Sequence, residues 1–143
     1  MNYDIVEKMM IKDEGIRYQL YEDSKMNTTI GIGYNIERNG ISKKIALDIF
    51  KECYGEIIRD LDKIFIDQSF LTFPENIQMV LFNMRFQMGY RGFRLFKKMI
   101  KAIKKQDWQE MIVEMKDSRW YNKYRLRANR LVDMVQEVIN GQR

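Results

Sequence analysis

Five side chains of apolar character recur at every fourth position in one stretch, and this pattern limits the fold more than any other feature. They are Ile45, Ile49, Cys53, Ile57 and Leu61. Because an α-helix has about 3.6 residues per turn, this spacing puts them on one face and predicts a long amphipathic helix. Ser42 precedes the pattern and can serve as its N-cap. We expect the helix to end in the looser segment that begins at Phe65.

The segment before this helix predicts a first helix and then a β-hairpin. Apolar residues at helical spacing in residues 3–14 are followed by Gly15, which is a common residue just after a helix. From Ile16 to Tyr21 apolar and polar residues alternate, and TTIGIGYNI at 28–36 resumes a β-branched strand pattern. The polar sequence EDSKMN between them predicts the hairpin turn, and ERNG predicts the next turn.

The second half of the chain predicts a series of helices. TFPE at 72–75 resembles a capping box and begins a helix that we expect to end at Gly89. DWQE at 107–110 repeats the same box. Basic helical stretches are predicted at 94–105, 108–116 and about 124–140, with Gly141 after the last.

These elements predict an α+β fold that is mostly α. A length of 143 residues with 45% hydrophobic content suits one domain with its own core. We expect a small hairpin lobe at about 15–41, joined by the long helix to a helical body made of residues 1–14 and 42–143. The active-site cleft is expected between these two lobes.

The sequence predicts no internal disulfide, no membrane span and no export signal. With Cys53 as the single cysteine, no internal disulfide can form, and we expect its side chain to pack in the core. No run reaches roughly 18 apolar residues, so no membrane span is predicted. Asp4, Glu7 and Lys8 interrupt the N-terminal segment with charges, so it does not predict an export signal.

The chain contains no histidine. This excludes Ser-His and Cys-His nucleophilic catalysis, histidine-dependent zinc hydrolysis, and any acid–base step that needs an imidazole. Carboxylates, lysines, tyrosines and Cys53 are left to transfer protons. We predict no metal ion and no cofactor.

Two carboxylates stand in contrasting predicted environments. Glu14 is at the end of a helix, where the partial negative charge disfavours an anion, and burial in a crevice would further favour its protonated form. Asp23 lies in a polar turn and would more easily stay ionised. A protonated and an ionised carboxylate are the usual groups for cleaving a glycosidic bond, and Thr29 could hold a water molecule by its hydroxyl.

The same residues also have a plainer interpretation. Glutamate and aspartate are common on protein surfaces. The glycines of TIGIG can simply let another backbone approach the strand. From the residues alone, both interpretations stay open.

Three separated motifs follow one another along the chain: Glu14-Gly15 with Asp23 and TIGIG at 29–33, NMRFQMG at 83–89, and SRWYN at 118–122 continued by RANR at 127–130. The first resembles the catalytic signature of the bacteriophage-type lysozymes, glycoside hydrolase family 24. The other two are similar to helical segments of the same enzymes, in the same order. The resemblance covers essentially the whole chain and implies a single lysozyme-like domain.

The resemblance implies a peptidoglycan hydrolase that cleaves the β-1,4 bond between N-acetylmuramic acid and N-acetylglucosamine. It implies that Glu14 is the general acid, while Asp23 and Thr29 position and activate the attacking water in an inverting reaction. Arg127 matches the family arginine that pairs with the catalytic glutamate. The remaining implied positions are Asn35, Phe86 and Gln87 for substrate binding, with Trp120 and Tyr34 in support.

The chain also departs from the family pattern. Tyr34 stands where members from T-even phages have a histidine, and Cys53 stands where they have an acid. We therefore expect packing instead of an ion pair between the sheet lobe and the long helix. The short segment between Gly33 and Ser42 implies a smaller hairpin lobe than in those enzymes.

The charge balance favours anionic partners. Lys plus Arg outnumber Asp plus Glu by 25 to 20, and basic residues crowd into 97–105 and 119–130, although such a run can also be a solvated helix face. We expect bacterial peptidoglycan as the partner of a monomeric chain, and no nucleic acid. Two other classes stay open. A nucleic-acid-binding module predicts salt-dependent DNA binding without lysis, and a membrane-disrupting protein predicts lysis that survives Glu14→Gln.

The resemblance to endolysins also implies a place and a role. The protein would accumulate in the cytoplasm of a bacterial host and reach the cell wall through a holin-type pore made by another protein. Its role would be bacteriolytic, ending in lysis of the host by a phage. Fusion to a phage tail is a second route to the wall.

Overall fold

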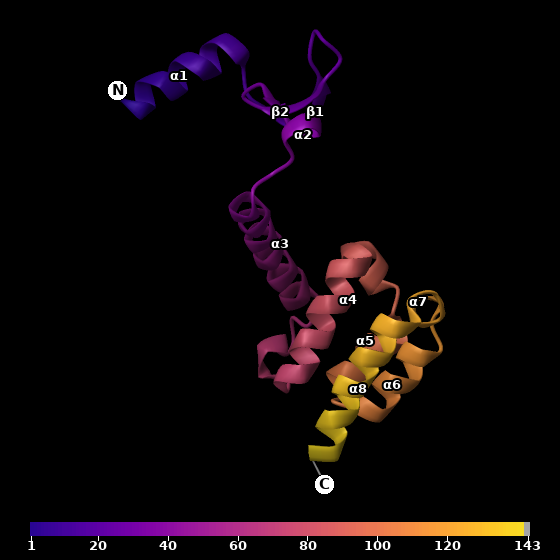
Figure 1. The fold of residues 1–143 in the computed structure, drawn as a ribbon. Helices are drawn as coiled ribbons and strands as arrows, with labels where there is room; N and C mark the ends of the chain where they lie inside the picture. Colours follow the sequence, from indigo (N-terminus) through magenta and orange to yellow (C-terminus); the bar gives the residue numbers. More distant parts are fainter. Residues whose placement is uncertain (142–143) are drawn as a thin grey trace. The chain divides into compact units, whose positions relative to one another are not determined.

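The computed structural model of the protein describes residues 1–141 and is mostly helical, with one small antiparallel sheet near the N-terminus (Figure 1). The predicted α+β fold with a dominant helical part is therefore confirmed. The chain divides into two units, Met1–Ile49 and Phe50–Arg143, called here the N-terminal unit and the helical unit. The predicted single domain, with residues 1–14 in the helical body, stays a prediction.

Helix α1, Tyr3–Glu14, has the ends that its sequence predicts. The side chain of Asn2 caps it by accepting hydrogen bonds from the backbone N–H groups of Asp4 and Ile5. Gly15 follows with φ 74° and donates its N–H to the carbonyl oxygen of Ile11 at 2.9 Å. Because a positive φ favours glycine, this residue ends the helix directly after Glu14.

The sheet has three short antiparallel strands in the order β1-β2-β3: Arg17–Glu22, Thr28–Gly31 and Tyr34–Asn35. Tyr21 lies opposite Thr29 between the first two strands, with an irregularity in register toward Arg17. Thr29 and Asn35 are opposite each other between the second and third. The predicted hairpin is present, and a two-residue strand extends it.

The turn predicted at ERNG, residues 37–40, is wrong, because its first three residues belong to the single-turn helix α2, Ile36–Asn39. The side chain of Asn35 supplies an N-cap by accepting the N–H of Arg38 at 2.9 Å. Gly40 ends the helix with φ 59°. A capping residue on one side and a glycine on the other are enough to close one helical turn.

Helix α3, Lys43–Ile64, begins in the N-terminal unit and ends in the helical unit. Ser42 caps it as predicted, since its Oγ accepts the N–H of Ile45 at 3.3 Å. The predicted apolar stripe is only partly buried: Ile57 and Leu61 are in the core, Cys53 is half-buried, and Ile45 and Ile49 are exposed. Only the C-terminal half of α3 therefore enters the core of the helical unit.

The helical unit continues with a 3₁₀ turn and five helices: Phe70–Thr72, then α4 Glu75–Arg94, α5 Lys97–Lys104, α6 Trp108–Lys116, α7 Arg119–Lys123 and α8 Arg125–Gly141. The capping box predicted at TFPE is wrong, because Pro74 takes the N-cap position and Thr72 donates its hydroxyl to the carbonyl of Ser69. At DWQE, Asp107 does cap α6 by accepting the N–H of Glu110. Gly141 lies within α8 and not after it.

Within α4 the regular helical path stops at Gly89, where the sequence predicts the end of a helix. Gly89 has φ 71° and ψ 169°, which are not helical angles, and a second helical segment follows as far as Arg94. Because glycine adopts this conformation more readily than other residues, it forms the kink between the two segments.

The core of the helical unit is formed by apolar side chains from all its longer helices. Members with the least exposure include Leu61, Ile77, Leu81, Met84, Phe93, Met111 and Val135. Phe73 packs edge-on against both Phe65 and Trp108, with ring centroids 5.5 and 5.8 Å apart. Helix α6 packs against both α5 and α8, and α8 also packs against α4, which lies beside it in Figure 1.

Among the described residues of this unit, one cation is buried. Arg85 of α4 is 8% exposed, and its Nε donates to Asp60 of α3 at 2.9 Å, while a second nitrogen also contacts Asp60. Its Nη2 reaches Glu56 at 2.7 Å. Because an unpaired buried charge is costly, these contacts fix which face of α3 meets α4.

No helix among residues 1–141 is long and apolar enough to cross a membrane.

Removing the buried cation is expected to destabilise the helical unit. Arg85→Met leaves Asp60 charged and unpaired, and should lower the free energy of unfolding by about 3–5 kcal/mol. Glu56→Gln should cost at most about 1 kcal/mol, because that carboxylate is largely exposed and its pairing is screened by water. Urea unfolding followed by circular dichroism measures both.

The matched control is the double variant Arg85→Met with Asp60→Leu, which removes both charges. It should recover most of the stability lost in Arg85→Met, because the penalty comes from the abandoned carboxylate. Equal losses in the single and double variants would contradict this account.

Candidate active site

The candidate acid Glu14 lies against the sheet of its own unit. It is the last residue of α1, and its Oε2 is 3.4 Å from the place where a Cβ on Gly33 would stand. Gly33 also has φ 68°, so glycine is favoured there by backbone conformation, and an added Cβ would be in contact with the Glu14 carboxylate. Gly15 and Gly33 together allow the end of α1 to approach the β2–β3 turn.

Asp23 is built into the loop between β1 and β2. Its Oδ1 accepts hydrogen bonds from the backbone N–H groups of Lys25 and Asn27, both at 2.8 Å. The side-chain amide of Asn27 donates to Oδ1 at 3.2 Å and to Oδ2 at 3.0 Å. Met26, between them, has φ 64°, a backbone conformation that is uncommon for residues other than glycine. The carboxylate thus organises a tight loop.

These hydrogen bonds lower the pKa of Asp23 below the ordinary value for an aspartate. The largest cause is the side-chain hydrogen bond from Asn27, followed by the backbone hydrogen bond from the same residue; the N–H and the charge of Lys25 add to it. Donors to a carboxylate stabilise its anion. The prediction that Asp23 stays ionised therefore agrees with its surroundings.

Thr29 is 2% exposed and lies in β2. Its hydroxyl donates to the carbonyl oxygen of Asn27 at 2.9 Å, and the same carbonyl accepts the N–H of Asp23 at 3.0 Å. A hydroxyl whose hydrogen is already donated can still accept hydrogen bonds through its oxygen. Thr29 and Asp23 are therefore linked through one residue, Asn27.

Tyr34 and Asn35 have roles within the N-terminal unit. The hydroxyl of Tyr34 donates to the carbonyl of Gly40 at 2.7 Å, which links β3 to the residue after α2. Asn35 caps α2 with its side-chain oxygen. Its role in substrate binding stays a prediction. Because its side-chain oxygen caps α2, its amide NH₂ is the group that would donate hydrogen bonds to a substrate.

Gln87 and Trp120 are paired in the helical unit. The indole N–H of Trp120 donates to Oε1 of Gln87 at 2.9 Å, and Phe96 packs edge-on against the indole ring. Trp120 is 6% exposed, so it supports Gln87 from below the surface. Phe86 is 47% exposed and contacts the ring of Phe50.

Arg127 is held by Asn83 in the same unit. Its Nε donates to the side-chain oxygen of Asn83 at 2.7 Å, and its Nη2 lies 3.5 Å from the backbone carbonyl. The guanidinium keeps further N–H groups for another partner. The predicted pairing of Arg127 with Glu14 stays a prediction.

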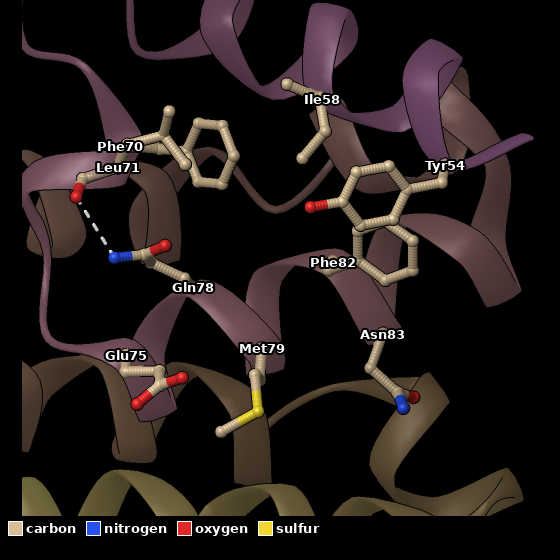
Figure 2. Close-up of a pocket in the computed structure, with 9 residues that line it drawn as sticks. All are labelled: Tyr54, Ile58, Phe70, Leu71, Glu75, Gln78, Met79, Phe82 and Asn83. Carbon is tan, nitrogen blue, oxygen red and sulfur yellow. Dashed lines mark hydrogen bonds between the residues drawn. The ribbon is translucent and has the colours of Figure 1, made fainter. Parts of the chain in front are cut away.

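A pocket of about 410 Å³ lies in the helical unit, between α3, the 3₁₀ turn and α4 (Figure 2). Tyr54, Ile58, Phe70 and Phe82 give it apolar walls, and its Gln78 donates its side-chain amide to the carbonyl of Leu71. Of its nine lining residues, only Glu75 is acidic. It therefore lacks the paired carboxylates that glycoside hydrolysis needs.

The N-terminal unit thus holds Glu14, Asp23 and Thr29, and the helical unit holds Gln87 and Arg127. Sequence reasoning missed their hydrogen-bond partners Asn27 and Asn83. The signal for Asn27 was its place four residues after Asp23 in a polar turn, where asparagine often bonds back to the loop.

Comparisons with known proteins give the chain relatives over most of its length. A probable T4-type lysozyme 2 of Dictyostelium discoideum is 30% identical over 89% of this chain and 91% of its own. A probable T4-type lysozyme 1 of the same organism is 29% identical over 92% and 93%. The pre-baseplate central spike protein Gp5 of Enterobacteria phage T4 is 26% identical over 90% of this chain, which spans 27% of the spike protein. No protein-family model matches.

The contact between Glu14 and Gly33 can be tested with a matched pair of glycines. Gly31 and Gly33 have φ angles of 67° and 68°, but only at Gly33 would an added Cβ meet a neighbour within 4 Å. Alanine at either position should lower the free energy of unfolding by about 1–2 kcal/mol, through backbone strain. Only Gly33→Ala should also shift the carboxyl ¹³C resonance of Glu14 in an NMR spectrum. An equal shift in Gly31→Ala would contradict the proposed contact.

Proposed function

The chain belongs to the T4-type lysozyme family, and we propose that it hydrolyses the β-1,4 bond between N-acetylmuramic acid and N-acetylglucosamine in peptidoglycan. The observation that carries the proposal is the family relationship over most of the chain, together with the hydrogen-bonded Asp23 and Thr29 in the same unit as Glu14. The enzyme is in this proposal a glycosidase of the lysozyme type.

Glu14 is the general acid of the proposed reaction. Its carboxylic acid gives a proton to the glycosidic oxygen as the bond from that oxygen to the anomeric carbon breaks. A water molecule attacks the anomeric carbon from the opposite face and so inverts its configuration. The proton released by the water passes to Asp23, and exchange with solvent restores both carboxyl groups.

The surroundings of Asp23 and Thr29 support their part in this reaction. Hydrogen bonds from Asn27 lower the pKa of Asp23, so its carboxylate is ionised near neutral pH and can accept a hydrogen bond from the water. Thr29 has already donated its hydrogen to Asn27 and can only accept one from the water. In the same proposal, Asn35, Phe86 and Gln87 contact the sugar chain, while Arg127 pairs with Glu14.

We also propose the cellular role implied by the resemblance to endolysins, which is lysis of a bacterial host by a phage. The protein would act as a monomer, reaching the wall from the host cytoplasm through a holin-type pore. A phage spike protein among the relatives supports a link to phages, whereas the two relatives from Dictyostelium belong to a eukaryote.

The basic helix α5 gives a reason to prefer a wall hydrolase over a membrane-disrupting protein. Met99, Ala102 and Ile103 form its apolar face, and all three are buried in the core of the helical unit. A helix whose apolar face is already covered cannot insert that face into a bilayer. Lys104 contacts Asp67 at 3.3 Å, whereas Lys97, Lys98 and Lys101 are exposed and can attract anionic wall material.

Replacing the acid tests the reaction. Glu14→Gln should lower the rate of peptidoglycan clearing by about 10²- to 10⁴-fold, because the amide cannot supply the proton. Asp13→Asn removes the neighbouring exposed carboxylate of α1 and should clear at the rate of the unsubstituted protein. Turbidity and new reducing ends are the readouts, with circular dichroism to confirm folding. Fresh product should be the α-anomer, as inversion of a β bond requires.

Equal clearing by the protein and Glu14→Gln would show that Glu14 is not the acid. If the unsubstituted chain neither clears peptidoglycan nor releases reducing ends but binds DNA, the nucleic-acid-binding alternative replaces this proposal.

Salt tests the part of the basic helix. The double variant Lys97→Gln with Lys101→Gln removes two exposed charges of α5. It should clear peptidoglycan more slowly than the unsubstituted protein, and its clearing rate should fall less as salt rises from about 0.05 to 0.5 M. Lys43→Gln with Lys51→Gln removes the same charge from exposed positions of α3 and serves as the control. The same salt dependence in both double variants would count against a specific role for α5.

A further inference from the structure

Asn27 connects the two groups proposed to hold the attacking water. Its side chain donates two hydrogen bonds to the carboxylate of Asp23, and its backbone N–H donates a third. Its carbonyl oxygen accepts the hydroxyl of Thr29 and the N–H of Asp23. No other residue in the described part of the chain bonds to the side chains of both.

The hydrogen bonds distinguish the two oxygens of Asp23. Oδ1 accepts from the N–H of Lys25 and from both donors of Asn27, so its lone pairs are occupied. Within residues 1–141, Oδ2 accepts a single hydrogen bond, from the amide of Asn27. An ionised carboxylate oxygen has room for about two, so Oδ2 keeps a place for a water hydrogen.

The hydroxyl of Thr29 is also fixed in one orientation by Asn27. A carbonyl oxygen cannot donate, so the contact between Thr29 and Asn27 must use the hydrogen of the hydroxyl. The threonine oxygen is then an acceptor toward any water. A water that donates one hydrogen to Oδ2 and the other to Thr29 would keep its own lone pairs free for attack on carbon.

We propose that Asn27 is a positioning residue, which holds Asp23 and Thr29 ready to accept hydrogen bonds from the attacking water. It touches neither substrate nor water, and it acts by fixing the orientation of one carboxylate and the hydrogen of one hydroxyl. The inference rests on the proposed hydrolysis of peptidoglycan and adds a residue to it.

Other charged groups around Asp23 do not account for its ionisation. In the same unit, Lys25 is in the loop, Glu22 ends β1, and the carboxylate of Glu37 in α2 accepts the hydroxyl of Thr28. The charge of the Lys25 ammonium lowers the pKa of Asp23 least, whereas the hydrogen bonds from Asn27 lower it most. Removing the amide should therefore raise the pKa of Asp23.

The test compares Asn27→Ala, Asn27→Asp and Ser24→Ala in the full chain. Alanine removes the amide but keeps both backbone contacts, so kcat should fall by about 10- to 100-fold with a smaller change in KM. The acid limb of the rate profile should move to higher pH, because Asp23 loses donors to its anion. Aspartate replaces a donor with a second negative charge and should move that limb further. Ser24, an exposed residue of the same loop, is the control and should leave the profile in place.

A ¹³C NMR titration of the Asp23 carboxyl carbon gives a second readout that does not depend on turnover. A raised pKa in Asn27→Ala, together with the displaced acid limb, is the expected result. If neither moves while Asp23→Asn abolishes hydrolysis, the inference is wrong and the proposed function stands. If the pKa moves and the rate profile does not, Asn27 supports the loop only, and the inference is again wrong. Absence of hydrolysis by the unsubstituted chain would overturn the proposed function and this inference with it.

Discussion

The buried pair between Arg85 and Asp60 determines how the helical unit is assembled. A guanidinium that is 8% exposed must find its counter-charge within the protein, so α3 has to present its acidic face to α4. Arg85 lies between Asn83 and the dipeptide Phe86-Gln87 on the same helix. The contact that holds α4 in place therefore also holds the backbone of Phe86 and Gln87, which the family resemblance assigns to the site, and of Asn83, which bonds to Arg127.

Local signals predict the ends of several elements, and long-range packing decides the rest. Gly15 ends α1, and Asp107 caps α6, because each acts on backbone groups a few residues away. Ile45 and Ile49 share the apolar face of α3 but are exposed. Periodicity predicts which side chains share a face, but it does not predict how far the core extends along that face. At Gly89, as at Gly15, a glycine with a positive φ ends a regular helical segment, and a second segment then follows within α4.

Part of the candidate site could be predicted because its two carboxylates lie in chemically different environments. Glu14 and Asp23 stand in environments that differ in hydrogen bonding, and the sequence shows this as a helix end and a polar turn. Their assignment to one reaction needed the resemblance to a family, because isolated carboxylates are common on surfaces. Asn27 could not be predicted from its type alone. Its role comes from three hydrogen bonds that it donates to the Asp23 carboxylate and one that its carbonyl accepts from Thr29. These contacts form only when the hairpin has folded.

In this chain without histidine, the proposed reaction divides its proton transfers between two carboxyl groups, and hydrogen bonds favour the ionised form of one of them, Asp23. Its pKa is lowered first by hydrogen bonds, and only last by the charge of Lys25. Short hydrogen bonds are little affected by dissolved ions, whereas the attraction between exposed lysines and a distant polyanion is screened within about 8 Å at physiological ionic strength. The ionised state of the candidate base should therefore survive conditions that weaken binding to the wall. Acid should act on the chemical step, and salt on association with the substrate.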